Sequence, residues 1–167
     1  MILLTVITTL VVAQRLSELA LARRNLKWAL AHGAIEYGAD HYWLFVVLHS
    51  GWLVGFNLEW WITKPTAPAI WPLLLVGIVL AQILRYWAIT SLGKYWNTRI
   101  VVFPGDALVK TGPYRYLKHP NYLAVVIELA AIPLLLGSWR TAVVASLLNA
   151  IMLFFIRIPA EQQALKQ

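Results

Sequence analysis

The sequence has no cysteine among its 167 residues and is poor in charged side chains. Without thiols it has no disulfide framework, no thiolate nucleophile and no thiolate metal site. Charged residues make up 13% of the chain, whereas a soluble domain carries roughly 25%. Hydrophobic residues make up 60%. We therefore expect one domain, spanning residues 1–167, that folds in a lipid bilayer.

Acidic residues are also scarce, and the net charge is +7. Such an excess of basic residues is typical of nucleic-acid binding. In so apolar a chain it instead indicates cytoplasmic loops that face anionic lipid. We therefore expect membrane lipid, and no nucleic acid, among the partners. The oligomeric state is left open.

Five apolar segments predict an all-α integral membrane protein with about five transmembrane helices. Their approximate ranges are 1–22, 42–61, 73–90, 121–136 and 141–156. The last two form a predicted helical hairpin that crosses the membrane fully or only in part. Residues 1–91 would then hold three spans, and residues 92–167 the motif region and the hairpin. Between spans, we expect a polar connector at 28–41 and a short extended piece in GKYWNTRIVV.

The basic residues predict the orientation of these spans. Ten lie in the segments assigned to one side, and Lys64 and Arg140 lie in the loops of the other. Basic loops usually face the cytoplasm. The sequence therefore predicts a multi-pass protein of the cell membrane with its C-terminus and its polar motif in the cytoplasm.

The most polar passage between apolar regions is Gly112–Tyr122, GPYRYLKHPNY. Gly112 and Pro113 mark a turn, and three basic or titratable side chains then alternate with tyrosines. Pro120 favours the first turn of a helix. A helix N-terminus beside His119 and several phenols suits a ligand with a carboxylate and a charged centre.

The pattern Gly-Pro-Tyr, Lys-His-Pro-x-Tyr, and then Arg157 and Glu161, resembles the isoprenylcysteine carboxyl methyltransferase family of integral membrane enzymes. The resemblance covers roughly residues 92–165. Two positions depart from the family pattern: Lys118 replaces the usual Arg, and Gln162 replaces a second Glu. The first ninety residues resemble a bacterial branch that methylates alkylpyrones.

This resemblance implies S-adenosylmethionine as cofactor and an O-methyltransferase acting on a carboxylate or enol of a lipophilic acceptor. It implies that Arg157 meets the oxyanion of the acceptor, a role that suits the forked donors of a guanidinium. The implied cofactor-binding residues are Leu108, Val109, Tyr114, His119, Pro120, Tyr122 and Glu161. No metal is expected, because His119 has no ligand-like spacing to His32 or His41.

Glu128 is an acid about two turns into the fourth apolar segment. A carboxylate at that depth is costly, so it should face the bundle interior and have a partner. Arg157, Arg85 and a protonated hydroxyl of the acceptor are the candidates. We expect Glu128 to be a catalytic residue that helps to orient the attacking oxygen.

Other functions remain open at this stage. A sterol-type membrane reductase would use NADPH, although the chain has no Rossmann fingerprint. A phospholipid N-methyltransferase would have to deprotonate its amine, which an anion-binding Arg157 does not favour. A non-enzymatic membrane scaffold or carrier would not need an intramembrane Glu128.

Overall fold

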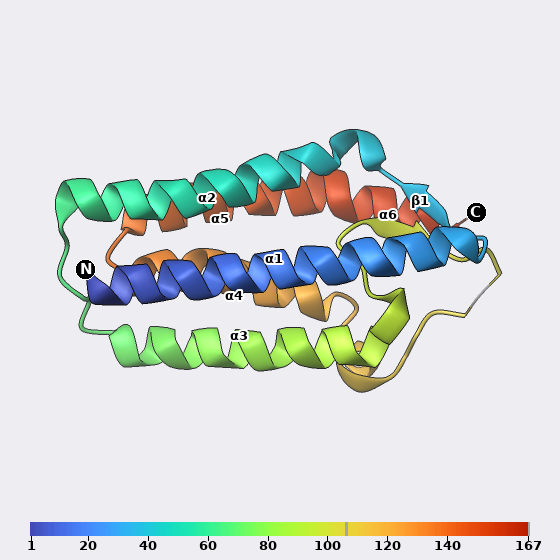
Figure 1. Ribbon diagram of the computed structural model, residues 1–167, viewed down its shortest axis with the longest axis horizontal. Coiled ribbons are helices and arrows are strands. Elements are labelled where there is room, and N and C mark those ends of the chain that lie inside the picture. The colour runs from blue at the N-terminus through green and yellow to red at the C-terminus, as the bar shows by residue number, and fades with distance from the viewer. Residues whose placement is uncertain (106, 167) are drawn as a thin grey trace. The chain divides into compact units, whose positions relative to one another are not determined.

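The computed structural model describes residues 1–105 and 107–166, which are mainly helical (Figure 1). Five long helices are present, as predicted, and the boundaries of the four that follow the first lie close to the expected ranges. The elements in chain order are α1 (Ile2–Ala31), β1 (Ile35–Tyr37), η1 (Ala39–His41), α2 (Tyr42–Thr63), α3 (Trp71–Leu92), η2 (Gly93–Tyr95), β2 (Ile100–Val102), η3 (Gly112–Arg115), α4 (Pro120–Leu135), α5 (Trp139–Met152), the π-helical η4 (Leu153–Arg157) and α6 (Ile158–Ala164).

The chain divides into two compact units, each built from separate stretches of sequence. The first unit comprises Met1–Val46, Leu92–Leu108 and Met152–Gln167. The second comprises Val47–Ser91 and Val109–Ile151.

In the first unit, α1 continues to Ala31, so the prediction that a connector begins at residue 28 was wrong. Arg and Lys are good helix formers, and the basic residues after Ala22 extend the helix past its apolar stretch. Asn25 secures this polar extension, because its Nδ2 donates to the carbonyl oxygens of Gly93 at 3.1 Å and Trp96 at 2.8 Å.

Two short strands pair beside the C-terminal end of α1 (Figure 1). β1 and β2 are antiparallel, with Ile35 opposite Val102 and Tyr37 opposite Ile100. The extended piece predicted in GKYWNTRIVV is confirmed as β2, whereas β1 lies in the segment expected to be a connector. α6 contacts both strands, so this small sheet supports the helix that carries Glu161.

In the second unit, buried polar side chains link the helices through backbone carbonyls. Trp52 Nε1 donates to the Leu129 carbonyl at 3.1 Å, and Ser138 Oγ donates to the Phe56 carbonyl at 2.9 Å. The predicted hairpin is present: α4 and α5 are joined by a tight turn with Gly137 at φ +78°. These bonds satisfy groups that would be costly to leave unpaired in an apolar interior.

Glu59, near the end of α2, caps the N-terminus of α5. One of its carboxylate oxygens accepts from the Arg140 backbone N–H at 3.0 Å. The other accepts from the Thr141 N–H at 2.8 Å and the Thr141 hydroxyl at 2.7 Å. A carboxylate at this position satisfies N–H groups that have no partner inside the helix and complements the helix dipole.

Within residues 1–105 and 107–166, three helical segments are long and apolar enough to cross a membrane: Ile2–Ala31, Trp71–Tyr95 and Trp139–Ala164. Between 17% and 28% of each apolar window is buried, so these apolar surfaces face outward, as a lipid solvent favours. α4 has 16 residues, or about 24 Å of helix against a core of about 30 Å. Five spans therefore stay a prediction.

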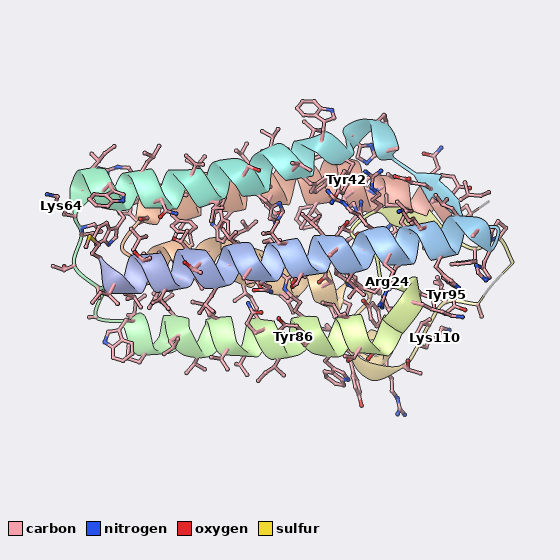
Figure 2. All side chains as sticks on the ribbon, in the orientation of Figure 1. Arg24, Tyr42, Lys64, Tyr86, Tyr95 and Lys110 are labelled. Carbon is pink, nitrogen blue, oxygen red and sulfur yellow. The ribbon has the colours of Figure 1, made fainter. Side chains whose placement is uncertain are left out.

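The second unit carries basic side chains at both of its ends (Figure 2). Lys64, in the loop after α2, and Lys110, before η3, lie at opposite ends of this unit, with Tyr86 between them. This arrangement is consistent with helices whose two ends face opposite sides of a bilayer.

Candidate functional site

The motif segment Gly112–Tyr122 forms a short 3₁₀ turn followed by the start of α4. Gly112 has a left-handed φ of +57°, Pro113 is buried, and the Tyr114 backbone N–H bonds to the Thr111 carbonyl at 3.2 Å. Pro120 is the first residue of α4 and His119 is its N-cap residue, at φ −132°. The predicted turn and the predicted helix start are both confirmed.

Glycine is required at position 112 both by the left-handed backbone and by the side chains that lie next to it. A Cβ at this position would lie 1.9 Å from Ser91 Oγ and 3.1 Å from Trp87 Nε1. The motif turn therefore packs directly on the end of α3. Any side chain at residue 112 would push the motif away from that helix.

We expect Gly112→Ala to lower the free energy of unfolding more than Gly93→Ala does. Gly93 has a similar φ of +54° but nothing within 4 Å of an added Cβ. Its substitution therefore reports the cost of the left-handed backbone alone, about 1 kcal/mol, whereas overpacking at Gly112 adds about 1–3 kcal/mol. Thermal unfolding in detergent measures both changes. Equal losses would show that Ser91 and Trp87 adjust at no cost.

His119 and Tyr122 form a stacked pair at the start of α4. Their ring centroids are 4.9 Å apart and the planes are inclined by 7°. Both side chains are half-buried, as is that of Tyr114 in the preceding turn. Stacking holds the imidazole and the phenol in one orientation at a helix N-terminus, which is a preformed site for an anionic group.

A polar cluster built around a fully buried ion pair lies between α3 and α4 of the same unit. Arg85 Nε and Nη2 donate to the two carboxylate oxygens of Glu128 at 2.9 and 2.5 Å, and Gln82 Nε2 donates to Glu128 Oε1 at 2.8 Å. The Arg85 and Glu128 side chains are 2% and 1% exposed. Of the three predicted partners of Glu128, Arg85 is therefore confirmed, in a bidentate pair.

This cluster reaches the start of the motif helix. Arg85 Nη1 lies 3.5 Å from Oδ1 of Asn121, a long hydrogen bond. Sequence reasoning missed both Gln82 and Asn121. Gln82 could have been found, because it lies three residues before Arg85 and therefore shares its helix face.

Arg157 belongs to the first unit and ends the π-helical segment before α6. It is 8% exposed, its Nη2 donates to the Thr98 carbonyl at 3.1 Å, and its guanidinium carbon lies 5.8 Å from the Phe45 ring centroid. Pro159 has no N–H to donate to the carbonyl of Phe155, four residues earlier, and Phe155 lies in the π-helical segment. The helix nevertheless continues past Pro159, to Ala164.

Glu161 lies one turn after Arg157 on α6 and is half-buried. Leu108 is exposed and Val109 is half-buried in the loop that follows β2. Each predicted site residue thus lies on a defined helix, turn or loop. The contacts of Leu108, Val109 and Glu161 with a cofactor stay predictions.

Comparisons with known proteins relate the sequence of this chain to a family. Residues 73–167 match the sequence model of the isoprenylcysteine carboxyl methyltransferase (ICMT) family. The matched range contains α4, the whole motif segment, Arg157 and Glu161. No solved structure matches the chain.

Two bacterial relatives match nearly the whole chain. The uncharacterized protein YpbQ of Bacillus subtilis is 41% identical over 159 residues, which cover 95% of this chain and 94% of that protein. An uncharacterized protein of Haemophilus influenzae is 24% identical over 156 residues, covering 93% of this chain and 90% of its own length.

Proposed function

Because the chain belongs to the isoprenylcysteine carboxyl methyltransferase family, we propose that it transfers a methyl group from S-adenosylmethionine to an acidic oxygen of a lipophilic acceptor. Family membership indicates a multi-pass membrane methyltransferase; the cofactor, the O-methylation and the acceptor class are our proposals. The observation that carries them is the match over residues 73–167, which includes the ordered motif turn and Arg157.

The residues at the motif fit the chemical groups of this cofactor. Its amino-acid carboxylate suits the N-terminus of α4, and its aromatic base suits the face of a stacked His119–Tyr122 pair. We propose that Tyr114 and Pro120 also contact the cofactor, next to the His119–Tyr122 pair. Leu108 and Val109 would contact the adenine ring, and the carboxylate of Glu161 would bind a cationic or hydroxyl donor of the cofactor.

When bound, S-adenosylmethionine supplies an electrophilic methyl group on a sulfonium centre. The protein then has to hold the acceptor oxygen in line with that methyl and exclude water, since proximity supplies most of the rate gain. A carboxylate or acidic enol is already an anion at neutral pH. A strong general base is therefore not needed.

We propose that Arg157 binds the oxyanion of the acceptor. Its burial and its hydrogen bond to the Thr98 carbonyl hold the guanidinium in place, and the forked donors of a guanidinium match the geometry of a planar anion. Glu128, whose two oxygens accept hydrogen bonds from Arg85 and Gln82, would hold Arg85 against Asn121 and so orient the start of α4. Direct contact of Glu128 with the acceptor is the alternative.

We also propose that the motif faces the cytoplasm in the cell membrane, because most basic residues lie in the segments on that side. Among acceptors, an alkylpyrone enol or a prenylcysteine carboxylate fits an anion-binding arginine. A phospholipid amine fits less well, because the amine has to lose a proton before it can attack.

Ligand-induced stabilisation tests the cofactor. S-Adenosylhomocysteine should raise the unfolding temperature of the purified protein in detergent, because a ligand that binds only the folded state adds about 2.7 kcal/mol at one hundred times its Kd. NADPH is the control ligand. Stabilisation by NADPH and not by S-adenosylhomocysteine would support the reductase class and overturn the proposal.

A further inference from the structure

A second site lies at the polar end of α1, in the first unit. The hollow has a volume of about 330 Å³ and is lined by Trp28, His32, Gly33, Lys94, Tyr95, Phe103 and Pro104. This is the size of a small ligand pocket. None of these seven residues belongs to the motif or to the proposed methyl-transfer site.

Aromatic rings form the walls of this hollow. The Trp28 ring stacks on His32 at 4.5 Å, meets Tyr95 edge-on at 5.7 Å and lies 5.7 Å from Phe103. The rings of Tyr95 and Phe103 also meet edge-on, at 5.3 Å. Rings that pack against one another in this way hold their positions before any ligand arrives.

The same rings hold two basic groups at the pocket. Lys94 Nζ lies 4.1 Å from the Trp28 ring centroid and 5.5 Å from that of Tyr95, a cation–π arrangement. The His32 ring is held in place as well, because its Nδ1 hydrogen-bonds to the Trp28 carbonyl oxygen at 2.7 Å. No acidic side chain is among the residues that line the hollow. Its charge therefore suits an anion.

The position in the chain points to an anion of the membrane. Trp28 and His32 lie at the end of the candidate span Ile2–Ala31, and Lys94 and Tyr95 end the candidate span Trp71–Tyr95. Figure 2 shows Tyr95 near the C-terminal part of α1, the part that also carries Arg24. Tryptophan and tyrosine favour the headgroup level of a bilayer, and basic pockets at the ends of membrane helices bind anionic headgroups.

We propose that this pocket binds the phosphodiester headgroup of an anionic phospholipid. The Lys94 ammonium would donate to the phosphate oxygens, and the aromatic walls would cover the glycerol part. At Gly33, with φ +85°, an added Cβ would have nothing within 4 Å, so the mouth of the pocket is open at this point. Such a lipid would anchor β2 and the end of α1.

Competition between two lipids tests the proposal. The probe is phosphatidylglycerol mixed in equal amounts with phosphatidylcholine, and native mass spectrometry of the purified full chain counts the copies of each lipid retained. We expect wild-type protein to retain phosphatidylglycerol preferentially. Lys94→Gln should reduce that preference about fivefold, the effect of one basic group at a membrane surface.

Two matched variants distinguish an effect of the pocket on lipid preference from an effect of surface charge in general. Lys94→Arg keeps the cation and should keep the preference, while Lys110→Gln removes an equivalent exposed charge outside the pocket and should leave it unchanged. Thermal unfolding confirms that each variant is folded. An equal loss in Lys94→Gln and Lys110→Gln, or no preference in the wild type, would overturn the proposal.

A soluble headgroup distinguishes the source of the phosphate. Millimolar glycerol phosphate should leave phosphatidylglycerol bound, because the lipid tails keep the headgroup at the membrane surface. Full displacement of the lipid at that concentration would overturn the assignment to a lipid and point to a soluble phosphate ester.

Discussion

Glu128→Leu is expected to lower the free energy of unfolding by about 3–5 kcal/mol, because it leaves Arg85 buried without its counter-charge. The pair is almost fully buried, so water cannot replace the lost carboxylate. Thermal unfolding in detergent, with wild-type protein in parallel, measures the change. Glu128→Gln keeps the shape of the side chain and loses its charge. Its free energy of unfolding should lie between those of the wild type and Glu128→Leu.

The double variant Arg85→Leu with Glu128→Leu tests the cause of that loss. Replacing both members by apolar residues removes the unpaired charge, so we expect it to recover most of the stability lost by the single variant. Gln82→Leu is the matched control in the same cluster. It removes one hydrogen bond to Glu128 but leaves the ion pair intact, and should cost about 1 kcal/mol.

The same variants separate a positioning role of Glu128 from direct contact with the acceptor. If the pair positions the start of α4, the double variant should recover stability and part of the methyl-transfer activity. If Glu128 itself contacts the acceptor, activity should stay lost in the double variant. Unchanged stability in Glu128→Leu would contradict the structural role of the pair.

Arg157→Ala is expected to reduce methyl transfer tenfold to a hundredfold while S-adenosylhomocysteine still binds. The basis is the proposed role of this guanidinium on the acceptor oxyanion, since a hydrogen bond to a charged group contributes about 1.5–3 kcal/mol. Arg157→Lys keeps the charge but not the forked donors, so it should recover only part of the rate. Labelled S-adenosylmethionine and extraction of the methylated lipid measure turnover.

Glu161→Ala should show the opposite pattern, with weaker binding of S-adenosylhomocysteine. Arg140→Ala is the control for charge, because Arg140 lies over the Trp139 ring at the start of α5 and has no proposed role in the reaction. Normal turnover in Arg157→Ala would exclude the proposed role. Loss of S-adenosylhomocysteine binding in that variant would show that Arg157 binds the cofactor and not the acceptor.

Most of the helices could be predicted because each coincides with a long apolar run bounded by turn residues. The starts of α2 at Tyr42 and α4 at Pro120 lie within one residue of the prediction. α1 is the exception: its final turns are polar and hold their place through Asn25 and the loop that follows α3. An apolar pattern cannot detect a helix end that is stabilised by a distant loop.

The candidate site was predictable in its residues but not in its contacts. The motif and Arg157 could be identified from the sequence, because a family resemblance depends on the order and spacing of residues along the chain. The sequence offered three candidate partners for Glu128 but could not choose Arg85 among them, because helix periodicity shows which face an acid occupies but not which helix lies opposite. Gln82 and Asn121 join that cluster only through the packing of α3 against α4.

The sequence by itself determined the membrane class, the long helices and the family, because composition, apolar length and motif spacing are local properties of the chain. Only the tertiary structure decided the β1–β2 pairing, the Arg85–Glu128 pair and the aromatic pocket at Lys94. Each of these joins residues far apart in sequence, and strands of three residues or single charged side chains carry too little pattern to identify their partners.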